Sequence, residues 1–304
     1  MRRGGRLVRA ALSIALALGA AACGGDSDPK LPNPAPPATT EVSGLAGPEG
    51  LTFDSNGVLY VGTSTGSIVR VFPEGFTDVF FETGRELAGL ATGPQNEIFA
   101  AAFTTGEVLA ISQAGVLRVA TSGLDSPNAI VFDRFQRPLV SAMGLGGRPQ
   151  IALIEIDGTY QTLTREIPTP NGMAFGPDGL LYVADTFNNR VVRMQQSDDG
   201  ELSTPELYAS GLGLPDGIAF DERGHLFVAG AGSIWVVLPE EAPAARPFVT
   251  AGDVYGPASL AFGFGTGRDP TRLYFTNFGF PELGSGSTVA SVRVGIRGNR
   301  LYAP

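Results

Sequence analysis

A six-residue phrase recurs six times along this chain, at intervals of 39 to 45 residues, and each copy opens an apolar stretch. Repeats of this length are typical of solenoids and propellers, because one copy alone cannot bury its apolar face. The sequence therefore predicts an array of similar units. The copies are PEGLTF (48–53), LAGLAT (87–92), PNAIVF (127–132), PNGMAF (170–175), PDGIAF (215–220) and PASLAF (257–262).

Each phrase is followed by a turn and by further short apolar segments. The second segments include VLYVGT (58–63), LLYVAD (180–185) and RLYFTN (272–277), and the turns before them are rich in Asp, Asn and Gly, which tolerate tight backbone. Short strands at even spacing, few helical stretches and 42 glycines are typical of all-β repeat proteins. With about four strands in a period of about 42 residues, each copy is expected to form one propeller blade.

We therefore expect an all-β fold, a six-bladed β-propeller with four-stranded blades, over residues 44–304. A linear solenoid is the alternative, but neither end of the chain shows a distinct polar capping repeat. Residues 39–44 and residues 299–303 both stay open as the segment that completes the last blade.

The first 22 residues carry four arginines and then an apolar run from Ala10 to Ala22. This pattern predicts a lipoprotein-type export signal over 1–22, since the apolar run is too short to span a bilayer stably. Cys23, the single cysteine, is expected to carry the lipid, and the Pro-rich residues 23–43 a tether without a core. Secretion with an incidental cysteine is the alternative. The expected protein is a monomer of the bacterial cell envelope, held to the membrane by its lipid only.

The charge of the chain excludes one class of partner. The formal net charge is −9, and removal of the four arginines of the signal would bring it to −13. Binding to phosphate backbones needs a basic surface, so we expect no nucleic acid partner. An acidic surface around an opening would attract cations instead.

One position inside the repeated phrase departs from the apolar pattern. If the copies surround an axis, the four oxygen-bearing side chains at this position meet at one end of the central channel. Carboxylates gathered without a partner are costly to bury, and a bound cation removes that cost. Local hydrogen bonding at a strand entrance is the alternative role for these residues. The second residues of the six phrases are Glu49, Ala88, Asn128, Asn171, Asp216 and Ala258.

The chemistry of the donor atoms limits which cations could bind at this ring. Carboxylate and amide oxygens without Cys or His suit hard ions, so we expect Ca²⁺, with Mg²⁺, Mn²⁺ and Zn²⁺ as alternatives. The single histidine, His225, opens a second strand and is expected to face solvent at the opposite rim. The ends of the second strands should return to the ring, which places Asp185 and Asn277 directly behind the cation ligands.

Two stretches, PNGMAFGPDGLLYVADT (170–186) and PDGIAFDERGHLFVAG (215–230), resemble the SMP-30/gluconolactonase/LRE-like family of six-bladed propellers. The resemblance implies a metal-dependent hydrolase that opens a lactone or a related carboxylic ester. It assigns the metal ligands to Glu49, Asn171 and Asp216, and substrate binding to Asn128. It also implies that Asp216 activates water while the metal polarises the carbonyl.

The chain departs from the sugar lactonases of that family at the residues that grip sugar hydroxyls. Ser126 stands where they carry an arginine, and Met143-Gly144-Leu145 replaces a glutamate. With Phe103 near the same opening, a more apolar lactone or ester is expected. The alternative function is a non-catalytic binding scaffold, because VADTFNNRVVRM (183–194) resembles an NHL repeat.

Overall fold

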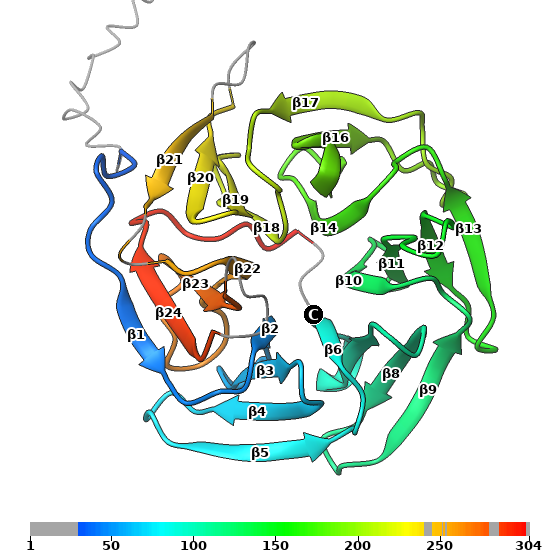
Figure 1. The fold of residues 1–304 in the computed structure, drawn as a ribbon, viewed down its shortest axis with the longest axis horizontal. Coiled ribbons are helices and arrows are strands. Elements are labelled where there is room, and N and C mark those ends of the chain that lie inside the picture. Colours follow the sequence, from blue (N-terminus) through cyan, green and yellow to red (C-terminus); the bar gives the residue numbers. More distant parts are fainter. Residues whose placement is uncertain (1–29, 240–244, 251, 253, 280–285, 302–304) are drawn as a thin grey trace, which may run out of the picture.

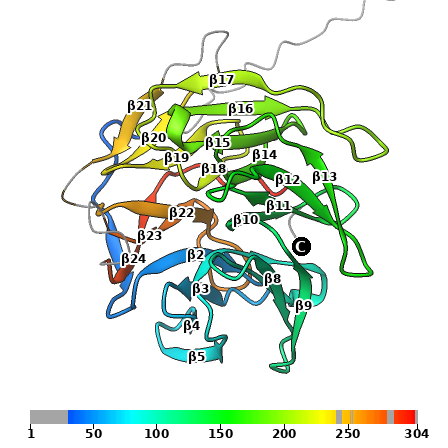
Figure 2. The same cartoon turned by 45° about the vertical axis from the view of Figure 1, so that its right-hand side comes forward.

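The computed structural model describes residues 30–239, 245–250, 252, 254–279 and 286–301. Within these residues, 24 strands pair into six antiparallel four-stranded sheets that surround a central axis (Figure 1). The turned view of Figure 2 shows the same sheets standing side by side around this axis. The predicted six-bladed β-propeller with four-stranded blades is confirmed.

Each blade runs outward from the axis in four strands. The inner strands are β2 (Pro48–Phe53), β6 (Leu87–Thr92), β10 (Pro127–Phe132), β14 (Pro170–Phe175), β18 (Ile218–Phe220) and β22 (Pro257–Phe262). The second strands are β3 (Leu59–Thr63), β7 (Ile98–Ala102), β11 (Pro138–Ala142), β15 (Leu181–Asp185), β19 (Leu226–Gly230) and β23 (Arg272–Asn277). The third strands are β4 (Ser67–Val71), β8 (Glu107–Ile111), β12 (Gln150–Ile154), β16 (Arg190–Met194), β20 (Ser233–Val237) and β24 (Thr288–Arg293). The outer strands are β5 (Thr77–Glu82), β9 (Leu117–Ser122), β13 (Tyr160–Thr164), β17 (Glu206–Ser210), β21 (Ala245–Val249) and β1 (Thr39–Val42), and two short 3-10 turns, η1 (Pro94–Asn96) and η2 (Thr186–Asn188), complete the elements.

The N-terminal strand β1 closes the ring. It pairs with β24 and forms the outer strand of the sixth blade, as the blue and red arrows of Figure 1 show. The propeller therefore begins at Thr39, where the sequence placed its start at residue 44. Residues 30–38 are also not a coreless tether, because Leu31, Ala35 and Ala38 pack against the core between blades five and six. The predicted signal peptide over 1–22 and the lipidated Cys23 lie outside the described residues.

The C-terminal segment does not complete a blade. Gly298 bridges to Asp221, and Asn299 donates from its backbone to the Phe220 carbonyl and from Nδ2 to the Phe175 carbonyl. Phe175 and Phe220 end the inner strands β14 and β18. Residues 298–301 therefore lie at the far end of the channel, opposite the starts of the inner strands. Figure 1 shows the C-terminal segment in red, running across the ring toward its centre.

The hydrophobic core is a ring of six clusters, one between each pair of neighbouring blades. Second strands such as β3 and β15 are buried along their whole length, since both of their faces pack against a neighbouring blade. This explains the continuous apolar runs of the second segments. None of the helices in the described residues is long and apolar enough to cross a membrane.

The third position of the repeated phrase brings neighbouring blades into close contact. A Cβ atom on Gly50, Gly89, Gly172 or Gly217 would stand 2.1 to 2.4 Å from the carbonyl oxygen of the second phrase residue in the next blade. No side chain fits at that distance. These four glycines therefore allow close approach of the inner strands at four of the six contacts around the axis, while Ala129 and Ser259 occupy the third position in the other two blades.

We expect Gly172→Ala to lower the free energy of unfolding by about 3 kcal/mol or more, because backbone must move to relieve the contact. Gly75→Ala is the control. Its Cβ meets no atom within 4 Å although φ is 92°, so its loss should stay near 1 kcal/mol. Urea unfolding measures both, and equal losses would contradict close packing at Gly172.

Candidate functional site

A break in strand register points the second phrase residues away from the sheet. In five blades the first phrase residue pairs with the end of the second strand, as Pro48 does with Thr63 and Pro170 with Asp185, and pairing resumes only at the fourth residue. The two residues between lie in an irregularity of the ladder, which re-aims side chains. In the fifth blade, Asp216 and Gly217 precede β18 and bond to Ala229.

The second residues of all six phrases line one cavity of about 620 Å³, which we call the mouth. They come from six different blades and lie at one end of the central channel. Glu49, Asn128 and Asn171 are buried, and Asp216 is partly accessible. The structure therefore brings together the four oxygen-bearing side chains singled out in the sequence.

The two carboxyl groups of the ring hold protons unusually well. Burial, and then the charge of Asp216, raise the pKa of Glu49 well above its usual value, and the exposed Glu86 adds to this shift while hydrogen bonding from Asn128 lowers it. Burial likewise raises the pKa of Asp216 to about 7, although a hydrogen bond from the Asn171 side chain acts to lower this pKa. Two carboxylates in one enclosed site resist ionisation together. A positive charge between them would relieve this.

The amide of Asn171 is held in one orientation by a hydroxyl group. Asn171 Nδ2 donates to Thr186 Oγ1 at 3.1 Å, and Thr186 Oγ1 donates to the Pro215 carbonyl at 2.8 Å. Because a threonine hydroxyl has one proton, once it donates to Pro215 it can only accept from Asn171. The Asn171 Oδ1 atom is left buried without a hydrogen-bond partner, which costs free energy unless a ligand binds there.

These donors fit a hard divalent cation. An unpaired amide oxygen and the carboxyl groups of Glu49 and Asp216 supply the oxygen ligands that Ca²⁺ and Mg²⁺ prefer. Among the described residues, no group of three or more His, Cys, Asp or Glu gathers as a metal site, so a cation here would depend on amide oxygens as well. Glu49, Asn171 and Asp216 are the residues that could hold it. Asn128 contacts the ring through Glu49 and donates weakly from Nδ2 to Met143 Sδ at 3.5 Å.

Asp185 and Asn277 do not line the mouth. Asp185 is buried and accepts from the Thr169 backbone and hydroxyl, Asn188 and Arg190, and Asn277 accepts from the backbone N–H of Tyr255. Both hold loops in place. Side chains alternate along a strand, so the residue after each second strand faces the mouth, and of the last residues of these strands only Gly230 lines it. The residues after the second strands are Ser64, Phe103, Met143, Thr186, Ala231 and Phe278.

His225 lies at the turn between β18 and β19, at the end of the blade away from the mouth. The prediction that it faces solvent is wrong, because its side chain is only 17% exposed and Nδ1 lies 2.6 Å from Oδ2 of the buried Asp221. In the NHL-like hairpin, Asn188 and Arg190 bond to Asp185, and Asn189 accepts from the backbone N–H of Leu214. These residues stabilise the hairpin and the loop that carries Leu214.

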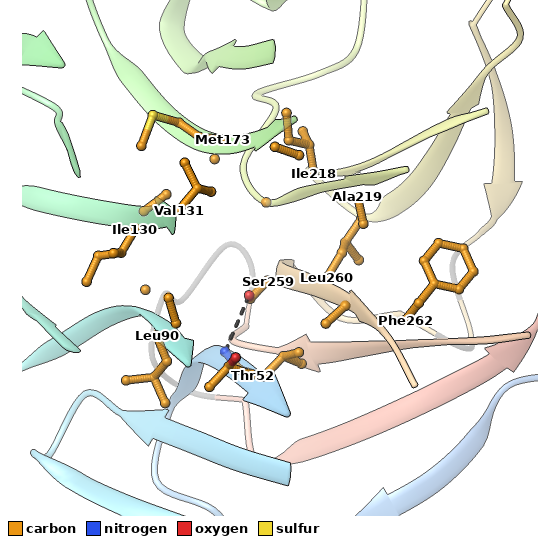
Figure 3. A pocket seen from close by; sticks show the side chains of 18 of the residues that line it. Thr52, Leu90, Ile130, Val131, Met173, Ile218, Ala219, Ser259, Leu260 and Phe262 are labelled. Carbon is orange, nitrogen blue, oxygen red and sulfur yellow. Dashed lines mark hydrogen bonds between the residues drawn. The ribbon is translucent and has the colours of Figure 1, made fainter. Parts of the chain in front are cut away.

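A second cavity of about 300 Å³ continues from the ring along the channel. Figure 3 shows apolar side chains such as Leu90, Ile130 and Leu260 along it, together with Thr52 and Ser259. The other polar residues of its lining are Thr92, Asn299 and Arg300, and Glu49, Asn128 and Asp216 of the ring. Ser259 Oγ accepts from the Leu51 backbone N–H at 3.4 Å (dashed in Figure 3). Thr52 Oγ1 likewise bonds to Thr92 of the next blade, so the hydroxyl groups of Thr52 and Ser259 serve contacts between blades.

Comparison with known proteins gives three findings. The family model for the SMP-30/Gluconolactonase/LRE-like region matches residues 47–278. "Putative sugar lactone lactonase YvrE" of Bacillus subtilis (strain 168) is 30% identical over 128 residues, a match that covers 40% of this chain and only 43% of that protein. Two solved structures share the fold. A gluconolactonase of Xanthomonas campestris matches with a TM-score of 0.70 and 18% sequence identity, over 84% of this chain and 88% of that chain. The calcium-binding protein regucalcin of Agrobacterium tumefaciens matches with a TM-score of 0.71 and 20% sequence identity, over 89% of this chain and 97% of that chain.

The raised pKa of Asp216 predicts a pH-dependent stability in the presence of chelator. The folded protein keeps a proton on Asp216 that the unfolded chain releases near pH 4. This contribution to stability is therefore lost as the pH rises toward and through about 7. We expect Tm in EDTA to fall between pH 5 and pH 8, and less steeply for Asp216→Asn, as measured by thermal unfolding. Parallel profiles for the two proteins would contradict the shift.

Proposed function

Because the chain belongs to the SMP-30/gluconolactonase/LRE-like family, we propose that it opens a lactone, or cleaves a related carboxylic ester, at the mouth of the propeller. The observation that carries this proposal is the convergence of Glu49, Asn128, Asn171 and Asp216 on one cavity, with an unpaired Asn171 Oδ1 among them. A divalent cation, Ca²⁺ by the chemistry of the oxygen donors, would supply Lewis-acid polarisation of the substrate carbonyl when bound. Glu49, Asn171 and Asp216 hold it.

Asp216 is the proposed general base. A base works best with a pKa near the working pH, and burial brings Asp216 into that range before a ligand binds. Water adds to the carbonyl carbon as its proton passes to Asp216. The ring C–O bond then breaks, and the proton returns to the leaving oxygen to give a hydroxy acid. Only a carboxylate oxygen that does not hold the cation can accept this proton. Asn128, which hydrogen-bonds to Glu49, is the proposed substrate-orienting residue.

The setting of this activity is also a proposal. The arginine-rich apolar start and Cys23 support an exported, lipid-anchored protein of the bacterial cell envelope that acts as a monomer on a small molecule. The net charge of −9 supports the absence of a nucleic acid partner.

Cation binding and turnover should depend on the same ring. With Ca²⁺ at about 100 times its Kd, the folded state gains about 2.7 kcal/mol, so Tm should rise by about 5–10 °C over an EDTA sample. Asp216→Asn should lose this rise and lower kcat on a lactone panel by about 10²-fold or more. Thermal unfolding and pH-stat titration measure the two effects.

Glu166→Gln is the matched control, because Glu166 is an exposed carboxylate outside the mouth. It should behave like the wild type in both assays. A wild-type protein that ignores both Ca²⁺ and EDTA and opens no lactone or ester would refute the hydrolase proposal, and would favour the non-catalytic binding scaffold.

Thr186 should set cation affinity through Asn171. Thr186→Val keeps the shape and removes the hydroxyl, which frees the amide to turn its oxygen away, so the cation Kd should rise about 10-fold or more. Thr186→Ser restores the hydroxyl and should bind nearly as the wild type does. Calorimetric titration with Ca²⁺ measures this without turnover. Equal affinities in Val and Ser variants would contradict the role of the hydroxyl.

A further inference from the structure

We propose, resting on the proposed function, that the mouth selects neutral lactones or esters that carry an alkyl chain, and that an apolar collar above the ring binds this chain. The collar is formed by six side chains from five blades that line the mouth cavity. They are Phe103, Met143, Leu145, Phe187, Leu214 and Phe278.

The collar exposes apolar surface that the fold itself does not use. Leu145 is 56% exposed, Phe187 is 61% exposed and Leu214 is 37% exposed, and all three face the same cavity. Single exposed apolar residues are ordinary on a protein surface, but a group of them around one cavity marks a binding site. The cavity of about 620 Å³ has the size of a small-molecule site.

The collar is held rigidly. The Leu214 backbone lies in the left-handed region with φ of 53°, which a bulky residue rarely adopts, and its N–H donates to Asn189 Oδ1 at 2.7 Å. The Phe187 N–H donates to Thr169 Oγ1 at 3.0 Å. Backbone strain that the surroundings enforce is concentrated at functional sites. Three further collar members are fixed through backbone N–H groups, with Phe103 bound to the Glu86 carbonyl, Met143 to that of Ser126 and Phe278 to that of Gly256.

The charges around the cavity disfavour an anionic substrate. Glu49, Glu86 and Asp216 line it, and none of the described residues lining it is basic. A phosphorylated or carboxylated lactone would meet acidic groups without a cationic side chain to bind it. Sugar hydroxyls would find few partners on Met143 and Leu145. A neutral compound with a hydrocarbon chain matches both the charge and the surface.

The test uses ring analogues that cannot be opened. 2-Methyl-, 2-butyl- and 2-hexyltetrahydrofuran lack the carbonyl, so calorimetric or ligand-observed NMR titration of the Ca²⁺-supplemented protein reports binding alone. Each buried CH₂ contributes about 0.8 kcal/mol, or up to about fourfold in Kd. We expect Kd to fall at least 10-fold from the methyl to the hexyl compound. Phe187→Ser and Leu145→Ser should each weaken hexyl binding several-fold and leave methyl binding unchanged.

Phe76→Ser is the matched control, since Phe76 is 56% exposed but lies outside the mouth. It should bind every analogue as the wild type does. A Kd independent of chain length, no binding at all, or an equal loss in Phe76→Ser would overturn the collar as a chain-binding site.

The two proposals fail separately. If the hexyl analogue binds through Phe187 but no lactone or ester is opened, the collar stands and the hydrolase proposal falls. If lactones are opened with the same kcat/KM whatever their chain length, the hydrolase stands and the collar proposal falls.

Discussion

Packing between neighbouring blades is the interaction on which the rest of the structure depends. The hydrophobic core is not one cluster but six, and each is shared by two adjacent sheets. A blade taken alone would expose both of its apolar faces, so the blades are stable only as a closed ring. The strand β1 completes the circle by pairing with β24. Closure also places six equivalent positions around one axis.

The ring at the mouth follows from this closure and from the close approach at the phrase glycines. Because Gly172 and Gly217 allow contact with the backbone of the next blade, Asn171 and Asp216 come close enough for the amide to influence the carboxyl pKa. The clustered groups are unfavourable by themselves, as the raised pKa values and the unpaired Asn171 Oδ1 show. The scaffold supplies the stability that holds them together.

Much of this architecture could be predicted from the sequence, since the period and the second phrase position carry long-range information in a repeat protein. The six blades and the gathering of Glu49, Asn128, Asn171 and Asp216 were both accessible in this way. The sequence could not show which residue at the end of each second strand faces the mouth, because a shift of one residue exchanges the two sides of a strand. Asp185 was expected directly behind the cation ligands, and Thr186, which lines the mouth at this strand end, was not singled out. Glu86 was missed for a related reason, since it stands just before its phrase and belongs to no repeated pattern.

Because the ladder is interrupted between the first and fourth phrase residues, the side chains that form the ring are independent of the strand pairing that holds each blade together. In five blades the residue at the second position makes no cross-strand pair, and in the fifth only the backbone N–H of Asp216 bonds across, to Ala229, so a change of side chain there leaves the ladder of the blade intact. Ala88 and Ala258 occupy the same position as the acids and amides. At these two positions the ring carries no oxygen donor, although the backbone could present one. Evolution, or a designer, can rewrite the donor set one blade at a time without having to rebuild the propeller around it.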